Sequence, residues 1–240
     1  SFLVDQYERL YVFALKYDTD TYREFKDNLG KLEEEIMDYY KPLGFENLTF
    51  QFLEYDQEVD LLLDFLRMVN DVERPDFCGA WNLDFDFPTI YNRLIRLGYS
   101  PEEAFSSADF PFKNAYFRLD GDLAKPISDR NSLFITSSYT TWIDQLATYA
   151  NINKPLGVLE SYSLNDIAER ELGQAKVDLG GGGGIRDIFL RDYYRFIRYS
   201  IHDTMLLSMI ERKVNHLDIL YQIASVTCTR LSHAMKKPTS

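Results

Sequence analysis

The sequence predicts an α/β domain, in which helices are layered against a sheet. Short runs rich in β-branched and aromatic residues, which are typical of strands, alternate along the chain with segments whose apolar residues recur at helical spacing. The chain has 240 residues, of which 45% are hydrophobic, and this is enough to bury the core of one large domain or two small ones.

The individual elements follow from these patterns. Strands are predicted at residues 9–18, 48–56, 76–82 and 132–138. Helices are predicted at residues 57–70, 87–98, 141–152, 161–173, 189–213 and 216–235. Residues 22–27 are interpreted as a continuation of the first strand, residues 31–45 as a connecting segment, and residues 99–132 as loops with a short hairpin.

Two further segments have specific signals. In the helix predicted at 161–173, Ser163 stands three residues before Asp166, as in a capping box, and Gly173 ends the helix. Five consecutive glycines occupy residues 180–184. Phosphate-binding loops have spaced glycines followed by Lys and Ser or Thr, so the run is interpreted as a flexible linker.

Composition excludes several classes of protein. No apolar stretch approaches the roughly 18 residues that span a bilayer, so no membrane partner is expected. Cys78 and Cys228 stand in apolar contexts and are expected to be free, buried thiols; no Cys/His cluster suggests zinc. The net charge of −12 argues against a non-specific nucleic-acid binder, which is usually basic. It does not exclude a site for divalent metal ions, because such a site itself consists of carboxylates.

Acidic side chains occur at two places where chemistry is possible. Asp86 follows a predicted strand and precedes a predicted helix, so it is either a helix N-cap or a metal ligand, and Asn82 before it can be a turn residue. Tyr199 and Asp203 are four residues apart and would share a helix face. Because apolar residues flank them, Asp203 either faces solvent or is paired, hydrogen-bonded or metal-bound.

These segments together resemble a known family. "NLDFD" at residues 82–86 and "YSIHD" at residues 199–203 resemble the second and third motifs of the 3′→5′ exonuclease domain of B-family DNA polymerases. "ITSSYTTWIDQL", "SYSLNDIAERELGQAK" and the helical sequence after the third motif are also similar to segments of this family, in the same order. The resemblance covers most of the chain and is greatest to viral polymerases.

The resemblance implies a ribonuclease-H-like exonuclease fold, a mixed sheet flanked by helices, with trailing C-terminal helices. Residues 1–213 would form the exonuclease-like domain and residues 214–240 a helical extension toward the polymerase body. The domain would remove mispaired nucleotides from a single-stranded primer 3′ end. Its partners would be this DNA and the remainder of the polymerase, inside the cell at sites of DNA replication, in bacterial or infected-cell cytoplasm or in the nucleus.

The resemblance also implies roles for particular residues. Two Mg²⁺ or Mn²⁺ ions would carry the hydrolysis, with Asp86 and Asp203 as metal ligands and Tyr199 orienting the attacking water. Asn82 would shape the site near the terminal nucleotide and Phe85 would pack beneath it. Lys176 would approach the site, whereas Asp84 would face solvent.

Further DNA contacts are expected around these residues. Unpaired bases would stack on aromatic side chains such as Phe85, Tyr116 and Phe117. Phosphates would contact a group of arginines: Arg186, Arg191, Arg195 and Arg198. The alternative is that these arginines form an ordinary solvated helix face.

One family motif is missing. The first motif is Asp-any-Glu on the first strand, but "VDQYE" places Asp5 and Glu8 three residues apart, on opposite faces of a strand. Residues 9–18 resemble the strand that follows this motif, so the chain is expected to begin just past it, through truncation or natural loss. We therefore expect weak or no exonuclease activity from the chain as written.

Two other classes of function remain open from the sequence. The first is a catalytically inactive exonuclease-like scaffold that binds DNA or proteins within a replication protein. The second is a structural α/β protein unrelated to nucleic acid, in which Asp86 caps a helix and Asp203 is exposed. Binding of Mn²⁺ would distinguish a catalytic site from a scaffold.

Overall fold

The computed structural model describes residues 1–122, 124–130, 132–173, 185–229 and 231. The chain divides into two compact units. Unit 1 consists of Ser1–Leu61 and Gln174–Ser208, and unit 2 of Leu62–Gly173 and Met209–Ser240. Both units combine helices with strands, which confirms the α/β class. The glycine run predicted as a linker lies outside the described residues, and the domain boundary predicted at residue 213 stays a prediction.

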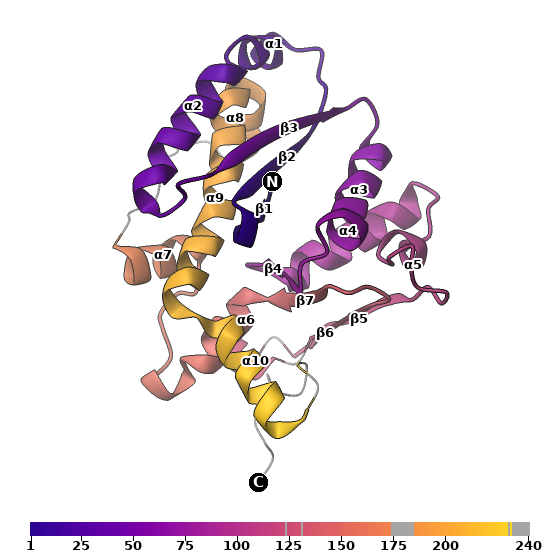
Figure 1. Cartoon of the computed structure of the whole chain (residues 1–240), viewed down its shortest axis with the longest axis vertical. Coiled ribbons are helices and arrows are strands. Elements are labelled where there is room, and N and C mark those ends of the chain that lie inside the picture. Colours follow the sequence, from indigo (N-terminus) through magenta and orange to yellow (C-terminus); the bar gives the residue numbers. More distant parts are fainter. Residues whose placement is uncertain (123, 131, 174–184, 230, 232–240) are drawn as a thin grey trace. The chain divides into compact units, whose positions relative to one another are not determined.

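Unit 1 contains a three-stranded sheet in the order β1–β2–β3 (Figure 1). The strands are β1 Phe2–Val4, β2 Arg9–Leu15 and β3 Thr49–Tyr55. β2 is antiparallel to β1 and parallel to β3, with Val12 opposite Phe52, so the sheet is mixed as expected. The strands predicted at 9–18 and 48–56 are thereby confirmed.

Two segments of unit 1 for which no helix was predicted form helices. Residues 22–27 belong to α1, Asp20–Asp27, whose N-cap Thr19 accepts a hydrogen bond from the Tyr22 amide at 3.3 Å. The segment interpreted as a connection forms α2, Leu29–Tyr40. Its apolar residues Leu32, Ile36 and Tyr40 recur every fourth position and are buried, which explains the helix.

The long helix predicted at 189–213 is two helices. They are α8, Ile185–Arg191, and α9, Tyr193–Val214. Asp192 separates them, and its Oδ1 accepts from the Arg195 amide at 2.9 Å as an N-cap does. α9 begins in an aromatic cluster of unit 1, where Phe25 of α1 lies between Phe52 and Tyr193 with both ring centroids near 5 Å.

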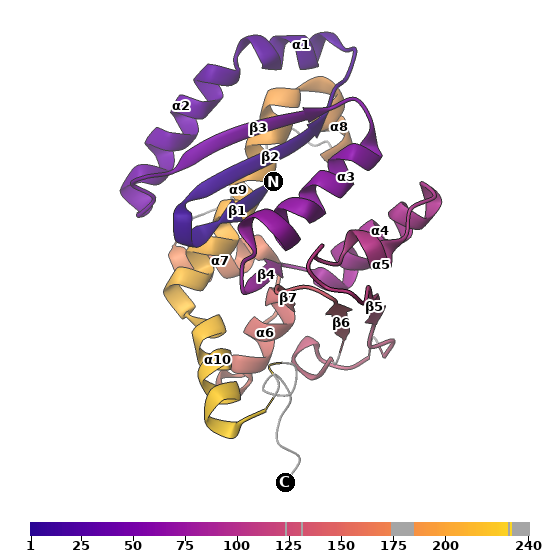
Figure 2. The same cartoon turned by 45° about the vertical axis from the view of Figure 1, so that its right-hand side comes forward.

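Unit 2 contains two pairs of strands (Figure 2). They are the parallel pair β4 Phe77–Ala80 and β7 Thr141–Asp144, and the antiparallel pair β5 Ala115–Arg118 and β6 Leu133–Thr136. The prediction of a helix over residues 141–152 is wrong for the first four, because buried Trp142 and Ile143 pair along β4. The strands at 76–82 and 132–138 are confirmed. The hairpin expected within residues 99–132 differs, because β5 pairs with β6, which lies beyond that segment.

The helices of unit 2 surround these strands. They are α3 Glu58–Arg67, which begins in unit 1, α4 Leu83–Arg96, α5 Pro101–Ala104, α6 Gln145–Ile152, α7 Leu164–Leu172 and α10 His216–Thr227. A π-helical turn, Met68–Glu73, extends α3. The predicted caps of α7 are confirmed, since Ser163 Oγ accepts from the Asp166 amide at 3.2 Å and Gly173 has a φ of 65°.

An aromatic cluster forms the centre of unit 2. The ring of Phe87 on α4 is fully buried and lies 4.4 Å from Phe105, 5.2 Å from Phe134 and 5.6 Å from Trp142, measured between centroids. This cluster holds the first turns of α4 against the strand pairs. It therefore fixes the polar residues that stand between β4 and α4.

Two expectations from composition have mixed outcomes. Cys78 and Cys228 are both free thiols, but Cys228 is exposed rather than buried. Among the described residues, no helix has the length and apolar character that crossing a membrane requires.

Candidate functional site

The motif residues of unit 2 lie at the junction between β4 and α4. α4 begins at Leu83, with Asn82 in the N-cap position. Asp86 is therefore not the N-cap; it stands in the first turn of the helix, where its amide donates to the Asn82 carbonyl at 3.1 Å. Burial raises the pKa of the Asp86 carboxyl, because ionisation is less favourable away from water.

Asp84 occupies a different place from the one expected. It does not face solvent: its side chain is half-buried and lines a pocket, and its Oδ1 atom is buried without a hydrogen-bond partner. Its amide donates to Oδ2 of Asp144 at 3.3 Å. Asp84, the second residue of α4, thus faces the end of β7 rather than water.

Asp144 joins the two helices that follow the parallel strands. Its Oδ1 accepts from the Ala147 amide at 2.7 Å and caps α6, while its Oδ2 accepts from the first turn of α4. Burial, together with the charge of Asp84, raises the pKa of Asp144 to about 6 despite these hydrogen bonds. The pair therefore places two carboxyl groups at the carboxyl ends of β4 and β7.

The motif residues of unit 1 lie on one face of α9. Burial raises the pKa of Tyr199 to about 12, and the neighbouring charge of Asp203 and a hydrogen bond with it contribute. The structure thereby confirms that these two residues share a helix face. Tyr199 holds its proton at neutral pH and can donate it in a hydrogen bond to Asp203.

The next residue on α9 anchors the helix. His202 is 5% exposed, and its Nδ1 lies 2.7 Å from the hydroxyl of Tyr40 on α2. Burial, and then the charge of Arg198, lower the pKa of His202, so this ring is neutral at pH 7. A neutral buried pair fixes the rotation of α9 next to Asp203.

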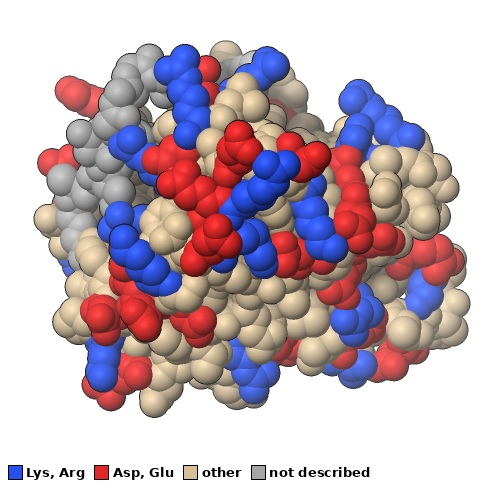
Figure 3. Space-filling view, turned by 90° about the horizontal axis from the view of Figure 1, so that it is seen from above, with Lys and Arg blue, Asp and Glu red and all other residues tan. Residues whose placement is uncertain are grey.

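The remaining predicted residues have varied environments. Phe85 is 65% exposed and Tyr116 is 44% exposed, so both aromatic rings are accessible to a ligand. Lys176 lies outside the described residues. On the face drawn in Figure 3, Lys and Arg side chains alternate with Asp and Glu, and no uniformly basic surface stands out there.

The donors expected to hold a metal ion are divided between the units, Asp86 in unit 2 and Asp203 in unit 1. Over the described part of the chain, no three His, Cys, Asp or Glu side chains form a group that could hold a metal ion. Both donors are carboxylates, which are the ligands that Mg²⁺ and Mn²⁺ prefer, and Mg²⁺ is often held by only one or two of them together with substrate phosphates. The chemistry of this donor set therefore fits such ions.

Comparison with known proteins gives a distant relationship. The chain is 23% identical over 177 residues to the DNA-directed DNA polymerase of Enterobacteria phage T4, a match that covers 72% of this chain and 18% of the relative. It is 25% identical over 171 residues to the DNA-directed DNA polymerase of Escherichia phage RB69, covering 70% of this chain and 17% of the relative.

The chain is similar to phage DNA polymerases. It spans less than a fifth of the length of these two relatives. No family model matches the chain. The similarity therefore supports a polymerase-related domain, and it leaves the particular activity of this domain to be argued from its residues.

The sequence prediction missed two residues that shape the pocket of unit 2. Asp144 was placed inside a helix, although an Asp before an apolar-periodic segment is itself an N-cap signal. Arg130 lines the same pocket and has no such signal, since it lies in a Pro-, Ser- and Asp-rich segment. Its position follows only from the fold.

Proposed function

We propose that the chain is the 3′→5′ proofreading exonuclease domain of a viral B-family DNA polymerase, with a ribonuclease-H-like fold. It would remove mispaired nucleotides from the single-stranded 3′ end of a primer, inside the cell where DNA is replicated. The similarity to two phage DNA polymerases supports the polymerase context. The ordered motifs that contain Asp86, Tyr199 and Asp203 support the exonuclease activity.

The contact between Tyr199 and Asp203 is the observation that carries this proposal. A protonated tyrosine that is hydrogen-bonded to a half-buried carboxylate forms a preorganised polar pair. In hydrolysis, the tyrosine hydroxyl would orient the attacking water next to the Asp203 carboxyl group.

The other motif residues complete the proposed site. Asp86 and Asp203 would hold Mg²⁺ or Mn²⁺, and these ions when bound supply Lewis-acid activation of water and stabilise the leaving 3′ oxygen. A cation would favour ionisation of Asp86, whose pKa burial raises. Exposed Asn82 and Phe85 would contact the terminal nucleotide, with the Phe85 ring stacking on a base. Lys176 would approach the site.

The test uses 5′-labelled single-stranded DNA and Mn²⁺ with the whole chain. We expect slow shortening from the 3′ end, which Asp86→Ala and Asp203→Ala abolish. Tyr199→Phe should slow it about a hundredfold, because it keeps the ring but removes the orienting hydroxyl. Asp122→Ala in unit 2 and Asp187→Ala in unit 1 replace exposed carboxylates and serve as matched controls.

A second candidate is a non-catalytic scaffold that binds DNA or proteins. The absence of a three-residue acidic group among the described residues favours it. Here the chain would bind labelled single-stranded DNA in EDTA, measured by fluorescence anisotropy, without shortening it in Mn²⁺. Shortening that persists in both aspartate variants would contradict the proposed site, and its complete absence would favour the scaffold.

A further inference from the structure

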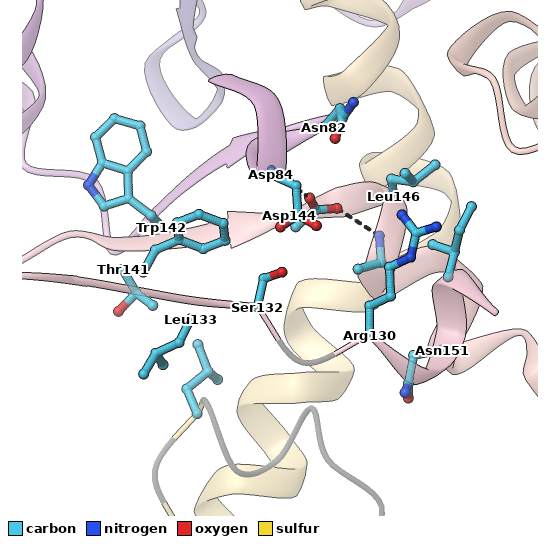
Figure 4. A pocket seen from close by; sticks show the side chains of 14 residues that line it. Asn82, Asp84, Arg130, Ser132, Leu133, Thr141, Trp142, Asp144, Leu146 and Asn151 are labelled. Atoms are coloured by element: carbon cyan, nitrogen blue, oxygen red, sulfur yellow. Dashed lines mark hydrogen bonds between the residues drawn. The ribbon is translucent and has the colours of Figure 1, made fainter. Parts of the chain in front are cut away.

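Unit 2 contains a pocket of about 100 Å³ at the carboxyl ends of the parallel strands β4 and β7 (Figure 4). Ligand sites in α/β proteins are commonly found at this edge of a sheet. Four of the polar residues around the space are central to the argument: Asp84, Asp144, Arg130 and Ser132, which come from α4, β7 and the segment before β6. The lining also includes Asn82, Thr141 and Asn151. They lie within one unit, so the pocket is a property of unit 2 alone.

Two polar atoms from pocket-lining residues are buried and have no partner in the protein. They are Oδ1 of Asp84, a hydrogen-bond acceptor, and Nε of Arg130, a donor. Buried polar groups in native proteins are nearly always hydrogen-bonded, and an exception requires a water, an ion or a ligand. A ligand that offers a donor to Asp84 and an acceptor to Arg130 would satisfy both.

Asp144 does not compete for such a ligand. Both of its oxygens accept backbone amides, at 2.7 Å from Ala147 and 3.3 Å from Asp84. Its role is to fix the starts of α4 and α6, and thereby the direction of the Asp84 side chain. The unpartnered Oδ1 of Asp84 therefore favours a ligand edge that presents an N–H group over one that presents oxygen.

The other walls of the pocket are apolar and aromatic. Trp142, Leu133 and Phe134 line it, and Trp142 is 8% exposed. A cavity of about 150 Å³ accommodates benzene, so this smaller space limits a ligand to a single six-membered ring. A fused purine is too large, whereas a planar pyrimidine suits aromatic walls.

We propose that this pocket binds the cytosine base of a nucleotide. Its N4 amino group would donate to Asp84 Oδ1, as cytosine amino groups do to carboxylates elsewhere, and its ring N3 or O2 would accept from Arg130 Nε. Uracil has the same shape but carries an oxygen at C4. This oxygen and Asp84 Oδ1 are both acceptors, so no hydrogen bond could form between them. The pocket therefore discriminates between the two pyrimidines.

This inference goes beyond the proposed nuclease, because it needs neither metal ions nor hydrolysis. The test is therefore made in EDTA, with isothermal titration calorimetry of the whole chain against deoxycytidine monophosphate and deoxyuridine monophosphate. We expect saturable binding of the cytosine nucleotide and binding of the uracil nucleotide at least about tenfold weaker. An oligo-dT strand with one dC at its 3′ end, compared with oligo-dT alone, then shows whether the pocket takes the base from a strand as well as from a free nucleotide.

Two variants locate the binding. Arg130→Met keeps the length of the side chain but removes Nε, and should weaken cytosine binding about tenfold. Asp84→Asn can donate to the uracil oxygen, so the preference for cytosine should fall below about threefold. Asp122→Asn, which replaces an exposed carboxylate, is the control, and far-ultraviolet circular dichroism establishes that each variant is folded.

Equal affinity for the two nucleotides, no saturable binding of either, or a cytosine preference that survives Asp84→Asn would overturn the proposal. The first two results would mean that waters satisfy the buried atoms. Because cleavage is absent in EDTA, none of these results bears on the nuclease proposal, which is tested separately in Mn²⁺.

Discussion

Asp144 should make the stability of unit 2 depend on pH in an unusual direction. Its pKa in the folded chain is about 6, against an ordinary value of 3.8, because burial and the Asp84 charge disfavour ionisation. A group with a raised pKa binds more protons in the folded state than in the unfolded state between these two values. Its contribution is therefore fully present below about pH 4 and is lost as pH rises through 6.

The size of this effect follows from the two pKa values. One pKa unit corresponds to about 1.4 kcal/mol, so the complete contribution is about 3 kcal/mol, of which about 2 kcal/mol appears between pH 7 and pH 4. Asp144→Asn removes the titration and keeps a side chain that can cap α6, since Asn is a good N-cap. The difference in unfolding free energy between the chain and this variant should therefore grow by about 2 kcal/mol on acidification.

The assay is urea denaturation followed by tryptophan fluorescence at pH 7 and pH 4. Both tryptophans, Trp81 and Trp142, belong to unit 2, so the signal reports on the unit that contains Asp144. Titration of carboxyl groups that do not interact with Asp144 cancels in the comparison, and Asp122→Asn controls for loss of an exposed charge. If the chain and Asp144→Asn change in parallel with pH, the carboxyl is not held in a desolvated site and the reasoning fails.

Three further substitutions test the packing by urea denaturation. For each, a denaturation midpoint equal to that of the unsubstituted chain would contradict the prediction. Phe87→Ala should lower the unfolding free energy by about 3–5 kcal/mol, because it empties the centre of the aromatic cluster. Tyr40→Phe should cost about 1–3 kcal/mol, since it leaves the buried Nδ1 of His202 without its partner at 2.7 Å; its unfolding is followed by circular dichroism. Trp81→Phe should cost about 1 kcal/mol, because it removes the indole N–H that donates a 3.0 Å hydrogen bond to the Tyr162 carbonyl. Circular dichroism follows the unfolding of this variant.

Local patterns were sufficient where one element determines its own structure. Tyr199 and Asp203 meet because four residues return to the same face of any α-helix, whatever surrounds it. The caps of α7 at Ser163 and Gly173 are equally local, since they satisfy the ends of their own helix. Such predictions need no knowledge of the rest of the fold.

Other elements depended on partners far along the chain. Thr141, Trp142 and Ile143 are residue types that favour strands, but the apolar periodicity that follows extended the predicted helix over them. They form a strand along β4, which lies more than sixty residues earlier and offers a parallel edge. Residues 22–27 were interpreted as a continuation of the first strand, but Tyr22 and Phe25 lie on one helical face and are buried in unit 1. Tertiary packing decided both cases.

The start of α4 decides which motif residues can act together. Since the helix begins at Leu83, Asp84 and Asp86 are separated by two positions, or about 200° around the helix axis. The Asp84 carboxylate therefore points toward Asp144 and the pocket. The Asp86 carboxylate points to the opposite side of the helix and does not line the pocket. Under the two proposals, a single sequence motif would supply two separate sites, and substitutions at Asp84 and at Asp86 should affect base binding and strand cleavage independently.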